Sequence, residues 1–164
     1  MDFTLLYQEY FDKVYRYHVA RTGNVHDAQD LTAETFKTAY ENLHRYRGDG
    51  TWGGWLFGIA HHKMADHYRR QKGRLEELDE QLVQPDADPE TLAFQNIQAF
   101  HVVAELNSLP SERAEALRLR FWGGLTASEV GEVMGKSEAA VKMLVFRGVQ
   151  ELRAVFSSEE QEVI

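Results

Sequence analysis

The amino-acid sequence predicts an all-α protein built from two small helical domains. Apolar residues recur at helical spacing along the chain, and no segment shows the extended alternation of apolar and polar residues that a strand requires. Residues 72–89, KGRLEELDEQLVQPDADP, lack a sustained apolar face and hold two of the three prolines. This composition favours a linker between two folded parts. We therefore expect domains at 1–72 and 89–156, an acidic linker at 73–88 and an acidic tail at 157–164.

The first domain is expected to begin with a helix from about Thr4 to Arg21, which Gly23 ends. Asn24, with Asp27 three residues later, can cap a second helix. At about 100° per residue, one face of this second helix is apolar and consists of Ala28, Leu31, Thr35, Ala39 and Leu43. The opposite face is an acidic stripe of Asp27, Asp30, Glu34 and Glu41. Such a stripe is either solvated surface or the binding site of a basic partner, because its like charges repel one another.

Residues 45–72 combine a glycine-rich loop with basic and aromatic side chains. Thr51 can cap a third helix, which ends in Arg69, Arg70 and Lys72. Aromatic faces that stack on bases, together with cations that follow phosphates, are typical of sites for single-stranded DNA. Base stacking is favoured for Tyr46 on the loop. The core is favoured for Trp55, which shares a possible buried stripe with Trp52, Leu56 and Ile59.

Residues 125–152, LTASEVGEVMGKSEAAVKMLVFRGVQEL, have the pattern of two capped helices joined by a glycine turn. Thr126 and Glu129 form a capping box, Gly135 supplies a left-handed stop, and Ser137 can cap the next helix. That next helix has a continuous apolar face of Val141, Val145, Gly148 and Leu152. The pattern is typical of a DNA-binding helix-turn-helix, although a plain helical hairpin in an all-α core shares it.

The sequence contains no recognisable catalytic motif. His62 and Asp66 could hold a metal together with the neighbouring His61 and His67, but the segment lacks the glutamate of the H-E-x-x-H motif. A histidine cluster that is solvated or faces DNA is favoured. Since there is no cysteine, no G-x-S-x-G elbow and no phosphate-binding loop, we expect no catalytic residue, metal or cofactor.

Composition and charge limit the remaining possibilities. A chain of 164 residues with 43% hydrophobic content can form a packed core, and no apolar run approaches the roughly 20 residues of a membrane span. The absence of cysteine and of a secretory N-terminal pattern favours a cytoplasmic location without membrane insertion. The net charge of −8 is concentrated in residues 73–100, which carry one basic and seven acidic residues. Such a chain should bind DNA weakly by itself, so a larger partner is expected to supply most of the attraction.

Three blocks together resemble bacterial RNA polymerase sigma factors of the sigma-70 family, in its extracytoplasmic-function (ECF) group. Residues 27–43, DAQDLTAETFKTAYENL, resemble the helix that docks on the polymerase clamp. Residues 46–70 resemble the segment that melts and reads the −10 promoter element, and residues 109–153 resemble the −35 reader. The resemblance implies a sigma domain 2-like first domain and a sigma domain 4-like second domain. It also implies that the linker runs through the RNA exit path and active-site cleft of the polymerase.

The same resemblance implies three sets of binding residues. Polymerase contacts would fall on Asp27, Asp30, Glu34 and Glu41. Contacts to −10 DNA would fall on Arg45, Tyr46, Arg47, Gly48, Asp49, Thr51, Trp52, His62, Arg69 and Arg70, with a flipped base held by the loop. Contacts to −35 DNA would fall on Thr126, Lys136, Ser137, Glu138, Ala139, Lys142, Phe146 and Arg147.

The chain departs from the family pattern at two places. Gly53-Gly54 stands where relatives often have an arginine-bearing segment, and Met143-Leu144 stands where they often have a Ser-Arg pair. Leu144 is then expected to join the core. The implied partners are core RNA polymerase, promoter DNA and, as in many relatives, an anti-sigma protein.

We therefore expect a non-catalytic initiation factor. A stand-alone helix-turn-helix regulator, with the first domain serving for dimerisation or sensing, and a metal-dependent helical enzyme are the alternatives. Neither accounts for the acidic stripe and the linker together.

Overall fold

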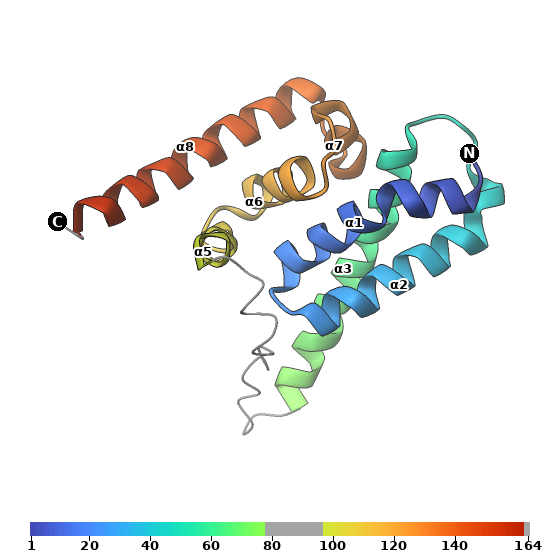
Figure 1. The fold of residues 1–164 in the computed structure, drawn as a ribbon, viewed down its shortest axis with the longest axis horizontal. Coiled ribbons are helices and arrows are strands. Elements are labelled where there is room, and N and C mark those ends of the chain that lie inside the picture. The colour runs from blue at the N-terminus through green and yellow to red at the C-terminus, as the bar shows by residue number, and fades with distance from the viewer. Residues whose placement is uncertain (78–96, 163–164) are drawn as a thin grey trace.

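All regular secondary structure in the described part of the chain is helical, as the sequence predicts. The computed structural model describes residues 1–77 and 97–162, with side chains described for 1–74 and 102–158. Most of the expected acidic linker and the end of the expected tail lie outside the described residues. Residues 73–77, which the sequence assigns to the linker, instead continue the third helix. We call α1 to α3 the first lobe and α5 to α8 the second lobe (Figure 1).

The first lobe is a bundle of three helices, α1 (Phe3–Thr22), α2 (Val25–Asn42) and α3 (Trp52–Glu77). The expected boundary between α1 and α2 is confirmed. Gly23 adopts a left-handed conformation with φ 64°, and the Asn24 side chain accepts a hydrogen bond of 3.0 Å from the Asp27 amide. The expected apolar face of α2 is also confirmed, since its residues are buried or, at Leu43, partly buried. Trp55 is partly buried against the core, as favoured from the sequence.

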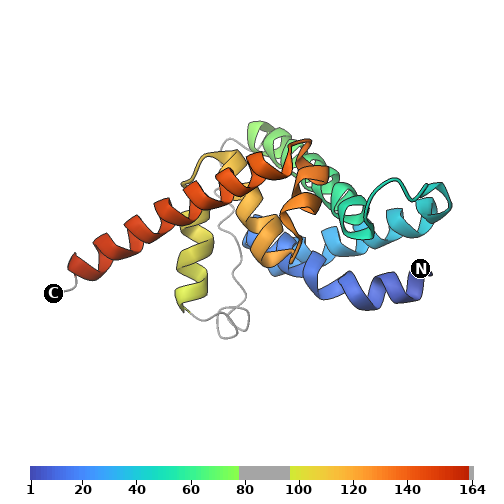
Figure 2. The same cartoon turned by 90° about the horizontal axis from the view of Figure 1, so that it is seen from above.

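The second lobe contains α5 (Ile97–Leu106), α6 (Ser111–Leu117), α7 (Ala127–Met134) and α8 (Glu138–Glu162). The predicted helix-turn-helix is α7 and α8. The capping box of Thr126 and Glu129 is present, Gly135 has φ 67°, and the Ser137 hydroxyl accepts from the Ala140 amide at 3.1 Å. Figures 1 and 2 show α8 extending well beyond the rest of the second lobe.

A π-helical turn, Arg118–Trp122, follows α6 directly and was not anticipated from the sequence. It closes with a hydrogen bond of 2.9 Å from the Gly123 amide to the Arg118 carbonyl. The turn directs the chain from α6 into the helix-turn-helix. It also buries Leu119 in the core.

The helices of the helix-turn-helix approach their neighbours closely at two glycines. A Cβ atom at Gly131 would lie 2.5 Å from the Lys136 carbonyl oxygen, and one at Gly148 would lie 2.8 Å from Leu117 Cδ1. Both distances are too short for a side chain, so these glycines set the packing of α7 and α8. Val141 is fully buried on the predicted inner face of α8, and Leu144 packs partly buried against the core, as expected.

The two lobes share one hydrophobic core. Leu125, Val130 and Val141 of the second lobe belong to the same buried cluster as Leu56 and Phe57 of α3. In both views α7 lies beside the first turns of α3, and α6 lies near α1 (Figures 1 and 2). The sequence predicted two domains joined by a linker but did not predict this contact between them. Among the described residues, none of the helices combines the length and the hydropathy that crossing a bilayer would need.

Candidate nucleic-acid and protein interfaces

A buried polar cluster holds the two lobes together. At its centre is Glu115, which is only 4% exposed. Arg21 of α1 lies with Nη1 3.2 Å from Glu115 Oε2, and His61 of α3 lies with Nδ1 3.2 Å from Oε1. The Tyr17 hydroxyl donates a hydrogen bond to the same Oε1. Arg118, from the π-helical turn, lies 3.7 Å from Oε2. A single carboxylate of α6 therefore binds side chains of both α1 and α3 in the first lobe.

The charges in this cluster explain how a carboxylate can be buried there. Burial alone raises the pKa of the Glu115 carboxyl, but hydrogen bonds from His61 and Tyr17 and the positive charge of Arg21 lower it below its ordinary value. Burial and the adjacent Glu115 charge raise the pKa of Tyr17 well above 10.0. Glu115 is thus ionised and Tyr17 neutral at ordinary pH. The one sequence signal for this cluster is the charged Glu115 within the otherwise apolar residues 114–117 of α6, and this signal does not reveal its partners.

The loop before α3 is built around stacked aromatic rings. Tyr46 stacks on Trp52 with ring centroids 3.9 Å apart, and its hydroxyl donates to the Gly50 carbonyl. The Thr51 hydroxyl accepts from the Gly54 amide at 3.0 Å and so caps α3, as expected. The expectation that Tyr46 is available for stacking needs refinement, because Trp52 already covers one face of its ring.

A concave surface brings together five of the ten residues assigned to −10 DNA. It is lined by Arg45, Tyr46, Arg47, Asp49, Gly50, Thr51, Gly54, Trp55 and, from the second lobe, Glu132. Of the other five, Gly48 lies in the same loop and Trp52 stacks on Tyr46, whereas His62, Arg69 and Arg70 lie farther along α3. At about 1.5 Å per residue, His62 is roughly 15 Å and Arg70 roughly 27 Å from Trp52 along the helix. His62 is exposed, Arg69 pairs with Asp66, and Arg70 faces α2 instead of the loop.

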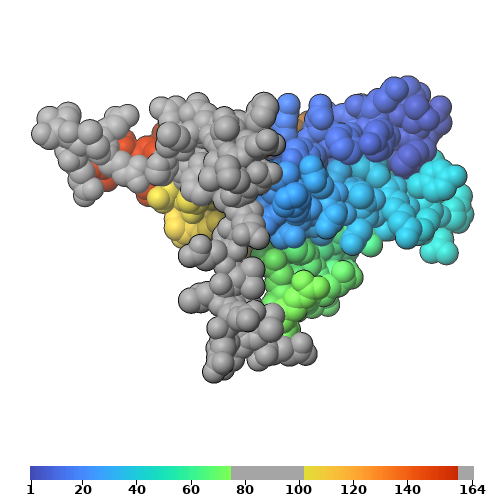
Figure 3. Space-filling model, turned by 60° about the horizontal axis from the view of Figure 1, so that its bottom comes forward, coloured from blue at the N-terminus to red at the C-terminus, as the bar shows by residue number. Residues whose placement is uncertain are grey.

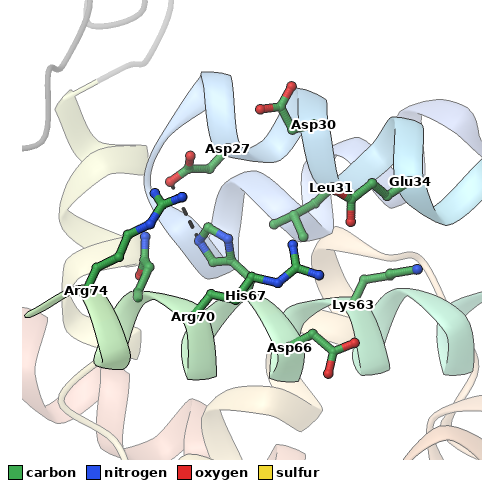
Figure 4. A pocket seen from close by; sticks show the side chains of 10 residues that line it. Asp27, Asp30, Leu31, Glu34, Lys63, Asp66, His67, Arg70 and Arg74 are labelled. Atoms are coloured by element: carbon green, nitrogen blue, oxygen red, sulfur yellow. Dashed lines mark ion pairs between the residues drawn. The ribbon is translucent and has the colours of Figure 1, made fainter.

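The acidic stripe of α2 faces a row of basic side chains on α3 across a shallow groove (Figure 4). Asp27, Asp30 and Glu34 line one side, and Lys63, His67, Arg70 and Arg74 line the other. His67 Nε2 lies 3.6 Å from Asp27 Oδ2. Asp30 and Glu34 remain exposed, whereas Glu41 lies outside the groove near the end of α2. Figure 3 shows α2 on the surface between α1 and α3, and since Asp30 and Glu34 are exposed, they are accessible to a large partner.

The helix-turn-helix presents a basic and apolar surface along α8. Lys142, Phe146 and Arg153 line a shallow groove with Arg120, and Phe146 is 57% exposed. Lys142 Nζ pairs with Glu138 Oε1 at 3.3 Å, and Lys136 Nζ pairs with Glu112 Oε1 at 3.1 Å. Of the other residues assigned to −35 DNA, Ser137, Ala139 and Arg147 are exposed, and Thr126 is exposed at the N-terminus of α7.

The histidine cluster of α3 does not assemble as a group. His61 binds Glu115 and His67 binds Asp27, whereas Asp66 binds Arg69. Among the residues whose side chains are described, no three histidine or carboxylate groups come together in the manner of a metal site. His61, His67 and Asp66 therefore take part in ion pairs, whereas His62 is exposed.

Comparison with known proteins identifies the class to which these surfaces belong. Residues 6–74 match the family description Sigma-70 region 2, and residues 106–154 match Sigma-70, region 4. The two matches coincide with the two lobes. The chain belongs to the ECF group of the sigma-70 family of RNA polymerase sigma factors.

Individual relatives support this assignment. The chain is 34% identical over 154 residues to the ECF RNA polymerase sigma factor BldN of Streptomyces coelicolor, covering 92% of this chain and 58% of BldN. It is 33% identical over 161 residues to ECF sigma factor SigE of Mycolicibacterium smegmatis, covering 96% and 62%. It is 30% identical over 161 residues to RNA polymerase sigma factor YlaC of Bacillus subtilis, covering 96% and 93%. The chain thus spans about three fifths of BldN and SigE and nearly all of YlaC.

Solved structures share the fold. Sigma factor RpoE of Bartonella quintana, in complex with the anti-sigma factor NepR, superimposes with a TM-score of 0.76 at 17% identity, covering 95% of this chain and 97% of RpoE. CnrH, in complex with the cytosolic domain of CnrY, superimposes with a TM-score of 0.71 at 21% identity, covering 95% and 88%.

Proposed function

We propose that this chain binds core RNA polymerase and directs it to promoters, where it assists opening of the −10 element. The observation that carries the proposal is that one molecule presents three separate surfaces. These are the acidic stripe on α2, the aromatic and basic loop before α3, and the helix-turn-helix of α7 and α8. Polymerase performs the chemistry, and the chain contributes no catalytic residue.

Each surface has a role that its chemistry suits. Exposed carboxylates of Asp30 and Glu34 would meet basic groups of the polymerase, where a partner relieves their mutual repulsion. The loop would hold a base flipped from the opened strand, with Arg45 and Arg47 near the phosphates. Flipping a base costs a few kcal/mol, so the loop should prefer DNA that polymerase has already opened. Lys142 and Phe146 would contact the −35 duplex in the major groove.

The proposed setting is the cytoplasm, where polymerase and promoter DNA are found. An inhibitory protein is a further proposed partner, because the similar sigma factors RpoE and CnrH were each solved with a bound protein, named for RpoE as an anti-sigma factor. Such a partner would compete with polymerase for the same two lobes.

Binding to core polymerase tests the proposal directly. We expect the purified chain to co-elute with core polymerase, and the double variant Asp30→Asn/Glu34→Gln to bind at least about tenfold more weakly, because its stripe loses two charges. The matched control is Glu9→Gln/Asp12→Asn, which removes two exposed carboxylates from α1. Failure of the unmodified chain to bind polymerase would overturn the function, and equal binding by both double variants would overturn the docking surface.

A further inference from the structure

The first helix of the helix-turn-helix lies over the loop that we propose to bind the opened strand. The Thr51 amide lies 3.3 Å from Glu132 Oε2, and the Thr51 hydroxyl lies 3.2 Å from the same oxygen and 3.3 Å from Glu129 Oε2. We infer that the free chain is self-inhibited, with the carboxylates of α7 occupying the single-stranded DNA site at the start of α3. This inference rests on the function proposed above.

The carboxylates bind the groups that DNA would use. The first amides of a helix and the cap hydroxyl form a site for anionic oxygens, and the helix dipole favours negative charge there. Glu132 also lines the concave surface beside Arg45 and Arg47, which are the cations best placed for phosphates. Because Glu132 lines this site, contacts Thr51 and carries the same sign of charge as a phosphate, it opposes DNA binding as long as the lobes stay together.

Two glycines make room for this contact. A Cβ atom at Gly53 would lie 2.2 Å from Glu129 Oε2, and one at Gly54 would lie 1.9 Å from Glu132 Oε2. Any other residue at either position would push the carboxylate away from Thr51. The Gly53-Gly54 pair therefore has a physical consequence in this chain.

The contact is incompatible with simultaneous binding to both promoter elements. Their names place them about 25 base pairs apart, which is roughly 85 Å along B-DNA at 3.4 Å per base pair. In the structure the helix-turn-helix touches the loop directly, and α3, with 26 residues, is only about 39 Å long. The lobes must therefore separate before the chain can act, and separation frees Thr51.

Two variants test the inference from opposite sides of the contact. Glu132→Ala removes the carboxylate, and Gly54→Ala displaces it while leaving every charge in place. Glu112→Ala is the matched control, since Glu112 is an exposed acid of the second lobe whose ion pair, among the described side chains, is with Lys136 of the same lobe. Circular dichroism verifies that each variant is folded.

The separation of the lobes is measured by energy transfer between dyes on the full chain. Because the chain has no cysteine, the exposed residues Gln8 and Ser157 can be changed to cysteine and labelled. Energy transfer should be high in the free chain, lower in Glu132→Ala and Gly54→Ala, unchanged in Glu112→Ala, and lowest with core polymerase bound.

Access to the loop is measured with a short, fluorescein-labelled single-stranded DNA of random sequence. Glu132→Ala and Gly54→Ala should bind it about fivefold more tightly than the unmodified chain, as expected when one or two hydrogen bonds that favour the closed state are lost. Unchanged energy transfer in both variants would overturn the contact. Lower energy transfer with unchanged DNA affinity would overturn the inhibitory role of the contact. A failure of the proposed function itself would be seen in a different measurement, because the chain would not bind polymerase.

Discussion

Arg21 of α1 and Glu115 of α6 form an ion pair of 3.2 Å across the boundary between the two lobes. Glu115 also accepts a hydrogen bond from Tyr17, and these partners belong to the first lobe, whereas Glu115 belongs to the second. Because the carboxylate is buried, the cluster favours one docked arrangement of the lobes over others. The relationship between the lobes is thus encoded by specific side chains in addition to the shared apolar core.

Removing the Glu115 charge should loosen this arrangement. We predict that Glu115→Gln lowers the free energy of unfolding by about 3 kcal/mol, because Arg21 and Arg118 lose their common anionic partner inside the interface. Urea denaturation measures the change, and Glu105→Gln, on the partly exposed surface of α5, is the control. A change of equal size in both variants would contradict the assigned role of Glu115.

The stability of the fold should depend on pH through His18. Burial lowers the pKa of His18 from 6.5 to about 3, so the folded chain keeps this ring neutral. Between these pH values the unfolded chain binds the extra proton. His18 therefore contributes its full stability above about pH 6.5, and that contribution falls by roughly 1 kcal/mol per pH unit as the pH decreases toward 3.

Urea denaturation at pH 7 and at pH 5 measures this dependence. Glu115 is not expected to contribute over this interval, because its pKa in the fold lies below 4.5. His18→Gln replaces the ring with a side chain that does not titrate and should abolish most of the difference between the two pH values. If the difference persists in His18→Gln, another group is responsible.

Two Gly→Ala changes, one in the helix-turn-helix and one in α3, are predicted to change the stability of the fold in opposite directions. Gly131→Ala should lose about 2 kcal/mol of stability, because its Cβ would lie 2.5 Å from the Lys136 carbonyl oxygen. Gly58→Ala, within α3, has nothing within 4 Å of the added Cβ and should gain about 0.5–1 kcal/mol from helix propensity. Thermal denaturation distinguishes the two, and a stabilised Gly131→Ala would contradict the packing of α7 against the turn.

Lys142 and Phe146 should affect −35 duplex binding in different ways. Lys142→Ala is predicted to weaken binding by a similar factor on all sequences and to reduce the salt dependence by about one charge, as for a phosphate contact. Phe146→Ala, which removes a 57% exposed ring, should reduce the preference for thymine at the contacted position, as for an apolar contact with its methyl group. Competition binding with assembled holoenzyme measures both. A changed base preference in Lys142→Ala would reassign that residue to base recognition.

Local features were predictable from the sequence because short-range chemistry determines them. The Asn24 cap, the capping box of Thr126 and Glu129, and the left-handed Gly135 depend on residues within one helical turn, and all are confirmed. The apolar faces of α2 and α8 follow from helical periodicity for the same reason.

Long-range features could not be predicted in this way. Glu115 contacts Tyr17 across 98 positions and His61 across 54, and Glu132 contacts Thr51 across 81. Periodicity within one helix carries no information about such pairs. The acidic stripe was found from the sequence, but the basic row of α3 that faces it depends on how the two helices pack.

The central claim is that this chain enables core polymerase to select promoters, and run-off transcription tests it most directly. Purified core polymerase is incubated with a genomic promoter pool, with and without the chain. The account predicts discrete transcripts that appear only with the chain and share sequences at the −10 and −35 positions. Identical transcripts with and without it, under conditions in which the chain is bound to polymerase, would contradict the account.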